Sequence, residues 1–263
     1  MRSRRPRRRG SSRVGATALA AVALVAWTSA VEAAGHIDNE SEYAACTALA
    51  RRDAEAAFES ALAWRDAGGG APAQHCIALA LIGLGQFAEA AARLETLAWD
   101  MVKTRPGLRA DVLGQAGQAW LRARQAERAD AALSAALDID PMNTELLIDR
   151  ALALATLGAF WEAIDDLNAA SDLDPDRADV YAFRASAYRY LDTLELASED
   201  VERALALAPG SPMALLERGN IRRMKGDDAG ARADWLEVLR AAPGTPAADA
   251  AQANIERLDL KVE

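Results

Sequence analysis

Apolar side chains recur with a helical period through most of the chain after residue 40. In the segment that starts at residue 178, Tyr181, Ala185 and Tyr188 follow one another at spacings of four and three, which places them on one helical face. A short polar turn at Asp192 follows, and a second amphipathic stretch comes after it; in the preceding segment the equivalent stretch runs from 161 to 173. The pattern predicts helix–turn–helix pairs.

The predicted helix pair recurs with a 34-residue period. Four prolines mark the period, at Pro141, Pro175, Pro209 and Pro243. Units of this length that start at 110, 144, 178 and 212 hold small residues at the eighth position and Ala at the twentieth, namely Gly117, Ala151, Ala185, Gly219, Ala129, Ala163, Ala197 and Ala231. Small side chains let two helices approach closely where they cross. One pair cannot bury its apolar face alone, so we expect the pairs to stack.

The repeat extends beyond these four units at both ends. A unit from Ala71 places Ala78, Gly85 and Ala90 at the eighth, fifteenth and twentieth positions, and a five-residue insertion between Trp99 and Leu108 separates it from the next unit. Upstream, 41–50 and 53–66 form a degenerate helical pair, and downstream 246–260 forms a lone helix. We therefore predict a degenerate pair at 34–70, a unit with an insertion at 71–109, four units at 110–245 and a capping helix at 246–263.

These units resemble the tetratricopeptide repeat family. The family's pattern is a 34-residue helix–turn–helix with small residues at positions 8 and 27, Ala at 20 and Pro at 32, and it matches 110–245 closely. The resemblance implies an all-α fold, an α-solenoid of stacked helix–turn–helix repeats that forms a right-handed superhelix. It also implies a non-catalytic protein that binds a protein or peptide partner along the concave surface built by the first helices.

The resemblance also implies which side chains face that groove. Positions 2, 5, 9, 12 and 13 of each unit share one helical face. The predicted groove residues are Gln118, Arg122, Ser186, Arg189, Tyr190, Leu216, Asn220, Arg223 and Met224. Arg and Tyr are common interface anchors, and Met adapts to varied apolar surfaces. The family's carboxylate clamp needs Lys and Asn at groove positions, and these units lack it. The Arg residues nevertheless suit an acidic or carboxylate-bearing peptide.

The amino-terminal segment has the order of a secretory signal peptide. Seven Arg lie between Arg2 and Arg13, an uncharged apolar run from Ala16 to Trp27 follows, and Val31 and Ala33 fit the −3 and −1 positions of a cleavage site. We predict a signal peptide at 1–33, with cleavage after Ala30 as the alternative. The protein is then periplasmic. Retention of the segment would instead give an inner-membrane anchor that faces the periplasm.

Charge argues against a nucleic-acid partner. Without residues 1–33 the chain has 23 basic and 38 acidic side chains, a net charge of −15, which repels a phosphate backbone. We expect contact with a membrane only if the amino-terminal segment is retained as an anchor.

The reactive side chains favour a structural role. His75 and Cys76 are adjacent on a predicted helix and point about 100° apart, so they cannot form a catalytic pair. Two Cys in an exported chain favour a disulfide between Cys46 and Cys76. His36 could add a metal ligand, but two Cys and two His are too few for a structural zinc site without other ligands.

No other motif points to catalysis. Paired acids such as Asp165 and Asp166 are expected on a solvated surface, and Trp120 and Trp235 occupy core positions. We predict no catalytic residue, cofactor or metal site. The favoured function is a periplasmic interaction scaffold. The alternatives are a membrane-anchored assembly factor or chaperone for the envelope or for cytochrome maturation, and an exported enzyme on a helical-repeat scaffold.

Overall fold

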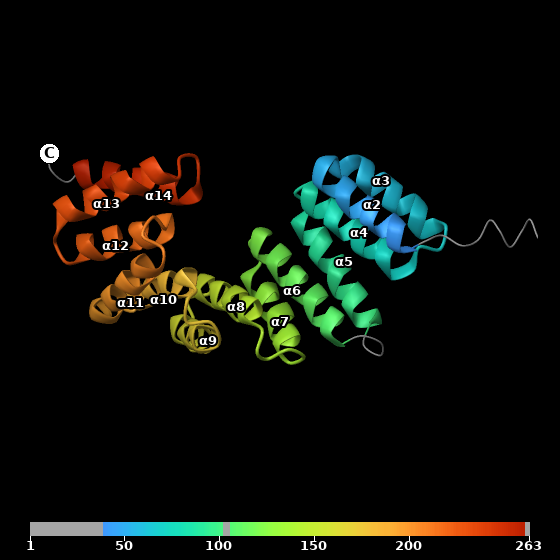
Figure 1. The fold of residues 1–263 in the computed structure, drawn as a ribbon, viewed down its shortest axis with the longest axis horizontal. Coiled ribbons are helices and arrows are strands. Elements are labelled where there is room, and N and C mark those ends of the chain that lie inside the picture. Colours follow the sequence, from blue (N-terminus) through green and yellow to red (C-terminus); the bar gives the residue numbers. More distant parts are fainter. Residues whose placement is uncertain (1–38, 102–105, 261–263) are drawn as a thin grey trace, which may run out of the picture.

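The computed structural model describes residues 39–101 and 106–260, and these residues form thirteen helices and no strand (Figure 1). The predicted signal peptide and His36 lie outside the described residues. The helices are α2 (Asn39–Arg52), α3 (Ala54–Asp66), α4 (Gly70–Gly83), α5 (Phe87–Asp100), α6 (Pro106–Arg122), α7 (Ala126–Leu137), α8 (Thr144–Thr156), α9 (Phe160–Leu173), α10 (Ala178–Tyr190), α11 (Leu194–Leu207), α12 (Pro212–Met224), α13 (Asp228–Ala241) and α14 (Pro246–Asp259).

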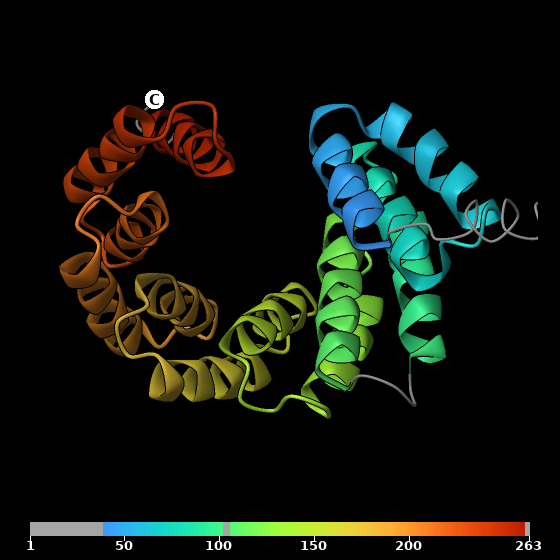
Figure 2. The same cartoon turned by 45° about the vertical axis from the view of Figure 1, so that its right-hand side comes forward.

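The helices stack as the predicted solenoid. Each helix packs on the next one in the chain, and the first helices of successive pairs also contact one another, as in α8 with α10, α10 with α12 and α12 with α14. Figure 2 shows the carboxyl-terminal half as an arc. Its inner side is formed by α8, α10, α12 and α14, and its outer side by α9, α11 and α13. The all-α solenoid is therefore confirmed.

Small residues set the distance between the two helices of a pair. The Ala side chains at the twentieth position are fully buried. A Cβ atom added to Gly117 would clash with the side chain of Leu133, and one added to Gly219 would clash with the indole of Trp235. Position 8 therefore has to be small in these units because position 24 carries a bulky side chain that packs directly against it. Trp120 and Trp235 are buried in the core, as predicted.

The turn inside each of the five pairs from α4 to α13 has a left-handed backbone at the fifteenth position of its unit. Gly85, Gly158 and Gly226 have φ values of 74°, 80° and 86°, and Arg124 and Asp192 adopt φ 59° at the equivalent place. Glycine enters this region without steric cost, whereas Arg124 and Asp192 hold a conformation that side chains disfavour. Helices α8, α12 and α14 begin with a side-chain cap: the side chains of Asn143, Ser211 and Thr245 accept hydrogen bonds from the backbone N–H groups of Leu146, Ala214 and Ala248.

The amino-terminal pairs are joined covalently. A disulfide links Cys46 on α2 to Cys76 on α4, the pairing expected from the sequence, with 6.3 Å between the two Cα atoms. Further along, α5 continues to Asp100 and α6 begins at Pro106, so the ends of these two helices contain part of the predicted insertion between Trp99 and Leu108. Residues 102–105 of the insertion lie outside the described residues.

A ladder of buried ion pairs repeats with the same 34-residue period. Arg150 pairs with Asp166, Arg184 with Asp200 and Arg218 with Asp234, each from position 7 of a first helix to position 23 of its second helix. The three aspartate residues are at most 8% exposed. The expectation of a solvated position for Asp166 is therefore wrong, because its carboxylate accepts hydrogen bonds from Nε and Nη2 of Arg150 at 2.8 and 2.6 Å.

The same arginines also reach the preceding pair. Arg150 donates to Ser134 Oγ on α7, and Arg184 donates to Asn168 Oδ1 and Ser171 Oγ on α9. Arg218 lies 3.7 Å from Glu202 on α11. Ser134, Asn168 and Glu202 all occupy the twenty-fifth position of their units. Each arginine therefore ties its own pair together and attaches it to the pair before it.

Candidate functional site

Two pockets open between successive first helices on the inner side of the arc, and they contain six of the nine predicted groove residues. The first pocket, here called the aromatic pocket, lies between α8 and α10 and is closed at one end by α9. The second, here called the arginine pocket, lies between α10, α12 and α14. Ser186 and Tyr190 line the aromatic pocket, and Arg189, Asn220, Arg223 and Met224 line the arginine pocket.

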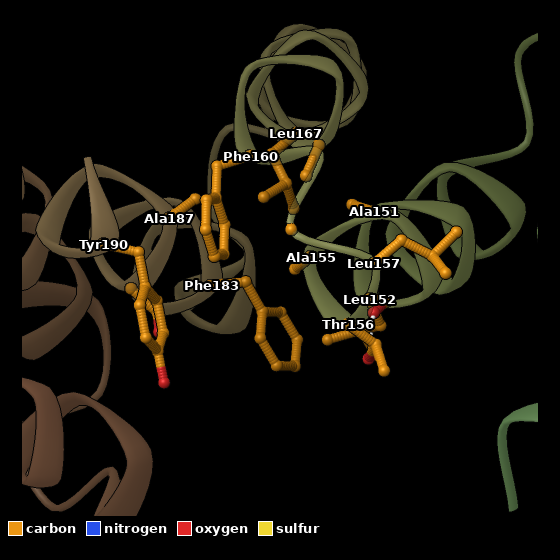
Figure 3. Close-up of a pocket in the computed structure, with 13 residues that line it drawn as sticks. Ala151, Leu152, Ala155, Thr156, Leu157, Phe160, Leu167, Phe183, Ala187 and Tyr190 are labelled. Atoms are coloured by element: carbon orange, nitrogen blue, oxygen red, sulfur yellow. Dashed lines mark hydrogen bonds between the residues drawn. The ribbon is translucent and has the colours of Figure 1, made fainter. Parts of the chain in front are cut away.

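The aromatic pocket is an open apolar cavity of about 580 Å³. Figure 3 shows the rings of Phe160, Phe183 and Tyr190 on one side, with Leu152 and Leu157 on the other. The rings of Phe160 and Tyr190 are stacked with 4.8 Å between centroids and 3° between planes. Tyr190 is nevertheless 62% exposed, so it presents a large face to solvent. Such a cavity offers a place for an apolar side chain of a bound partner.

The arginine pocket is polar and has a volume of about 700 Å³. Its lining residues are Arg189, Asn220, Arg223, Met224, Trp235, Asn254, Arg257, Leu258 and Leu260. Three guanidinium groups and two side-chain amides therefore surround it, and none of the described residues that line it carries a carboxylate. The two pockets meet at α10, where the guanidinium of Arg189 lies 4.3 Å from the ring centroid of Tyr190.

Arg189 is held by its neighbours on the groove floor. Its Nε donates to Oε2 of Glu217 at 2.6 Å, and the Glu217 carboxylate is buried. Burial alone would lower the pKa of Arg189, but the hydrogen bond and charge of Glu217 outweigh it, so the pKa is raised and the guanidinium stays charged. Arg189 therefore serves first as a link between α10 and α12, a role that its sequence position did not reveal.

A hydrogen-bonded chain continues from Glu217 across the next two first helices. The Asn220 amide donates to Glu217, and its Oδ1 accepts from the Trp235 indole at 3.3 Å and from Asn254 Nδ2 at 2.8 Å. Asn254 in turn accepts from Arg257 at 2.7 Å. These bonds fix the orientation of both amides. The polar floor of the pocket is therefore pre-ordered, which lowers the entropy lost when a ligand binds.

Three predicted groove residues lie outside both pockets. The amide of Gln118 donates to Asp149 Oδ2 at 2.7 Å, and Arg122 lies over the Phe87 ring at 4.0 Å from its centroid. Burial raises the pKa of Asp149, and the hydrogen bond from Gln118 acts in the opposite direction. Leu216 packs against the core. The structure gives these side chains neighbours within the protein and does not gather them with the other six.

The sequence reasoning missed the contribution of the last helix. It assigned α14 a capping role, whereas Asn254 and Arg257 line the arginine pocket. A signal was present, because Asn254 follows Asn220, and Arg257 follows Arg223, by one full repeat period. The aromatic pocket likewise uses Phe160 and Phe183, which lie outside the predicted groove positions. Phe160 reaches it from the second helix of its pair.

His75 forms a second polar site, at the amino-terminal end. Its Nδ1 lies 2.7 Å from the Tyr43 hydroxyl on α2 and its Nε2 lies 2.8 Å from Gln115 Oε1 on α6. Because an amide oxygen only accepts, Nε2 carries the proton and Nδ1 accepts from Tyr43. Burial lowers the pKa of His75 and raises that of Tyr43, which keeps both groups neutral. Its neighbour Cys76 is in the disulfide, so the two form no nucleophilic pair.

Two other kinds of site are absent from the part of the chain that the structure describes. There, no three His, Cys, Asp or Glu side chains are grouped so that they could hold a metal ion. Within the same residues, no helix has the length and apolar character needed to cross a bilayer.

Comparisons with known proteins agree with this architecture. A family model described as tetratricopeptide repeat matches residues 178–211, the unit formed by α10 and α11. A comparison with curated protein sequences finds no match. Among solved structures, MamA from Desulfovibrio magneticus RS-1 (residues 41 to end) is 21% identical with a TM-score of 0.57, over 67% of this chain and 97% of that one.

Two further solved structures share the fold. The tetratricopeptide repeat protein TTC0263 from Thermus thermophilus is 17% identical with a TM-score of 0.58, over 73% of this chain and 100% of that one. A chain of the Cut9–Hcn1 hetero-tetramer of the APC/C is 23% identical with a TM-score of 0.59, over 72% of this chain and 36% of that one. At these identities the likeness concerns the fold. The unit at 178–211 is therefore a tetratricopeptide repeat, and the 34-residue period extends on both sides of it.

Proposed function

We propose that this protein is a non-catalytic interaction scaffold that holds a protein or peptide partner on the inner surface of its arc. The observation that carries the proposal is the pair of adjoining open pockets between successive first helices, one apolar and one cationic. An extended or helical segment of a partner that crosses α10 would place an apolar side chain against Tyr190 and Phe183. A neighbouring polar side chain would then lie beside Arg223 and Arg257.

The aromatic pocket supplies the anchor in this proposal. Tyr190 and Phe183 are large and keep few rotamers, so they bury much area at low entropic cost. Burial of one Leu or Phe side chain contributes about 1.5–3 kcal/mol. The scaffold around the pocket is fixed by the Arg–Asp ladder and by the Arg189–Glu217 pair, which hold the first helices at set spacings.

A capture experiment with matched aromatic variants tests the proposal. The tagged protein is used to recover partners from a periplasmic extract, in wild-type form and as Phe183→Ser with Tyr190→Ala. Trp161→Ala is the control, because Trp161 is 57% exposed, lies on the outer helix α9 and lines neither pocket. We expect the double variant to lose the partner that the wild type and the control retain. Retention of the partner by a folded double variant would refute the assignment.

We also propose that the protein acts in the periplasm after removal of residues 1–33. The Arg-rich start, the apolar run and the small residues before Ala34 support this proposal. The intact mass of protein recovered from the cell envelope tests it, and the expected species begins at Ala34. A species that retains Met1 to Ala33 would contradict cleavage, and it would favour the membrane-anchored assembly factor instead.

A further inference from the structure

The cations of the arginine pocket follow the repeat into the last helix. Arg189, Arg223 and Arg257 occupy the twelfth position of α10, α12 and α14, each one repeat period after the one before. Successive first helices pack side by side, so the three guanidinium groups converge on one cavity. The helix that ends the solenoid therefore supplies a binding surface as well as a cap.

The three arginines differ in how strongly each is already paired with a carboxylate of the protein. Arg189 is paired with the buried Glu217 carboxylate. Arg223 lies 2.9 Å from Asp228, whose side chain is about half exposed and screened by water, so this pair is weak. Arg257 donates to the Ala253 carbonyl and to Asn254, and among the described residues it has no carboxylate within ion-pair distance. Arg257 and, after it, Arg223 are therefore available to an anion.

The remaining lining matches a carboxylate on a peptide better than a free inorganic anion. A guanidinium donates two parallel hydrogen bonds to the two oxygens of a carboxylate. Met224, Leu258 and Leu260 add apolar surface beside the arginines, which suits the methylene groups of an acidic side chain and its neighbours. The aromatic pocket adjoins at Arg189 and Tyr190, so an acidic residue bound here lies close to an apolar anchor.

We infer that the arginine pocket binds the side-chain carboxylate of an acidic segment in the partner protein, and that Arg257 and Arg223 donate the hydrogen bonds to it. This inference rests on the proposed function, since it names the class of partner that the same inner surface takes. The chain without residues 1–33 carries an excess of 15 negative charges even with the three pocket arginines counted, so its net charge repels an acidic partner away from this pocket. The pocket would then select both the partner and its register along the arc.

Selection from a random peptide array tests the inference. The probes are the array peptides themselves, and the readout is the composition of the peptides bound by the protein without residues 1–33. Four proteins are compared: the wild type, Arg223→Gln with Arg257→Gln, Arg203→Gln with Arg240→Gln, and Phe183→Ser with Tyr190→Ala. Arg203 and Arg240 lie on the outer helices α11 and α13 and line neither pocket, so they match the loss of two charges.

We expect the wild type and the Arg203/Arg240 control to select peptides that combine Asp or Glu with an apolar residue. The Arg223/Arg257 variant should keep the apolar preference, lose the acidic one, and bind the selected peptides about tenfold or more weakly. Wild-type selection without acidic residues, or an acidic preference that survives in the Arg223/Arg257 variant, would overturn the inference and leave the proposed function standing. Absence of any selected peptide, or selection unaffected by Phe183→Ser with Tyr190→Ala, would overturn both.

Discussion

Arg189 and Glu217 form an ion pair that is shielded from solvent and joins α10 to α12 at the floor of the groove. The side chains of the two residues are 14% and 9% exposed. Position 12 of a first helix is a groove position by resemblance, and Arg189 does reach the pocket. Its charge is nevertheless neutralised by Glu217 within the protein. Substitutions of Arg223 and Arg257 therefore test partner binding more directly than substitutions of Arg189.

Replacement of Arg189 should destabilise the fold. Arg189→Met keeps the apolar stem and leaves the Glu217 carboxylate buried without a counter-charge, at a cost of about 3 kcal/mol. We expect urea denaturation to show a clearly lower midpoint. The double variant Arg189→Met with Glu217→Met should recover most of the loss, because it leaves no charge unpaired. A single variant as stable as the wild type would contradict the role assigned to the pair.

The Arg–Asp ladder should matter more than the exposed ion pairs. Asp200→Ala leaves the Arg184 guanidinium without its counter-charge, and the Arg184 side chain is only 15% exposed. The substitution should therefore lower the free energy of unfolding by about 3 kcal/mol. Asp176→Ala is the control, because Asp176 is 86% exposed and pairs with Arg203 only at 3.6 Å, so its loss should cost less than about 0.5 kcal/mol. Equal midpoints for the two variants in urea would show that the ladder does not hold the pairs together.

The repeat architecture was predictable from the sequence because packing fixes residue size at a few positions. Gly117 against Leu133 and Gly219 against Trp235 require small side chains at position 8, and the closing prolines mark the period directly. The ladder was harder to predict, since Asp166 resembles an exposed acid unless its partner is known. Its 34-residue recurrence at Asp200 and Asp234 was visible, yet only the structure shows that Arg at position 7 faces Asp at position 23.

The groove was predictable only in outline. Helical periodicity and the family resemblance selected the face that contains Tyr190, Arg223 and Met224, and these residues do line pockets. Contacts between neighbouring units decide which side chains remain available to a partner. Glu217 pairs with Arg189, and Asp149 accepts a hydrogen bond from Gln118. Such contacts depend on how the units are rotated against one another. The positions within a single unit do not contain that information.

The amino-terminal pairs should lose stability when His75 is protonated. The folded state lowers the pKa of His75 below its ordinary value of 6.5, so the folded protein binds fewer protons than the unfolded one. The stability that neutral His75 contributes to the folded state is therefore present above pH 6.5 and is lost as the pH falls through the lower folded pKa. We expect the unfolding midpoint of the wild type to fall relative to that of His75→Gln when the pH is lowered from about 7 to about 5. A difference that does not change with pH would refute this linkage.

The disulfide should stabilise the same region. It closes a loop of 30 residues between α2 and α4, and by a chain-entropy argument this is worth about 3–4 kcal/mol. Cys46→Ala with Cys76→Ala should lower the thermal midpoint and allow early hydrogen exchange in α2 and α3, while α10 to α14 keep their protection. Labelling of both Cys by an alkylating reagent in denaturant without reductant would show that the bond does not form.

Site-specific photocrosslinking in the cell tests most directly whether the partner binds inside the arc. A photoreactive phenylalanine analogue replaces Tyr190 or Met224 on the inner helices, and Trp161 or Leu236 on the outer helices α9 and α13; all four side chains are exposed. Our account predicts a discrete adduct of the same partner from Tyr190 and Met224 and none from Trp161 and Leu236. An adduct formed only from the outer positions, or the absence of any adduct from the inner ones, would contradict it.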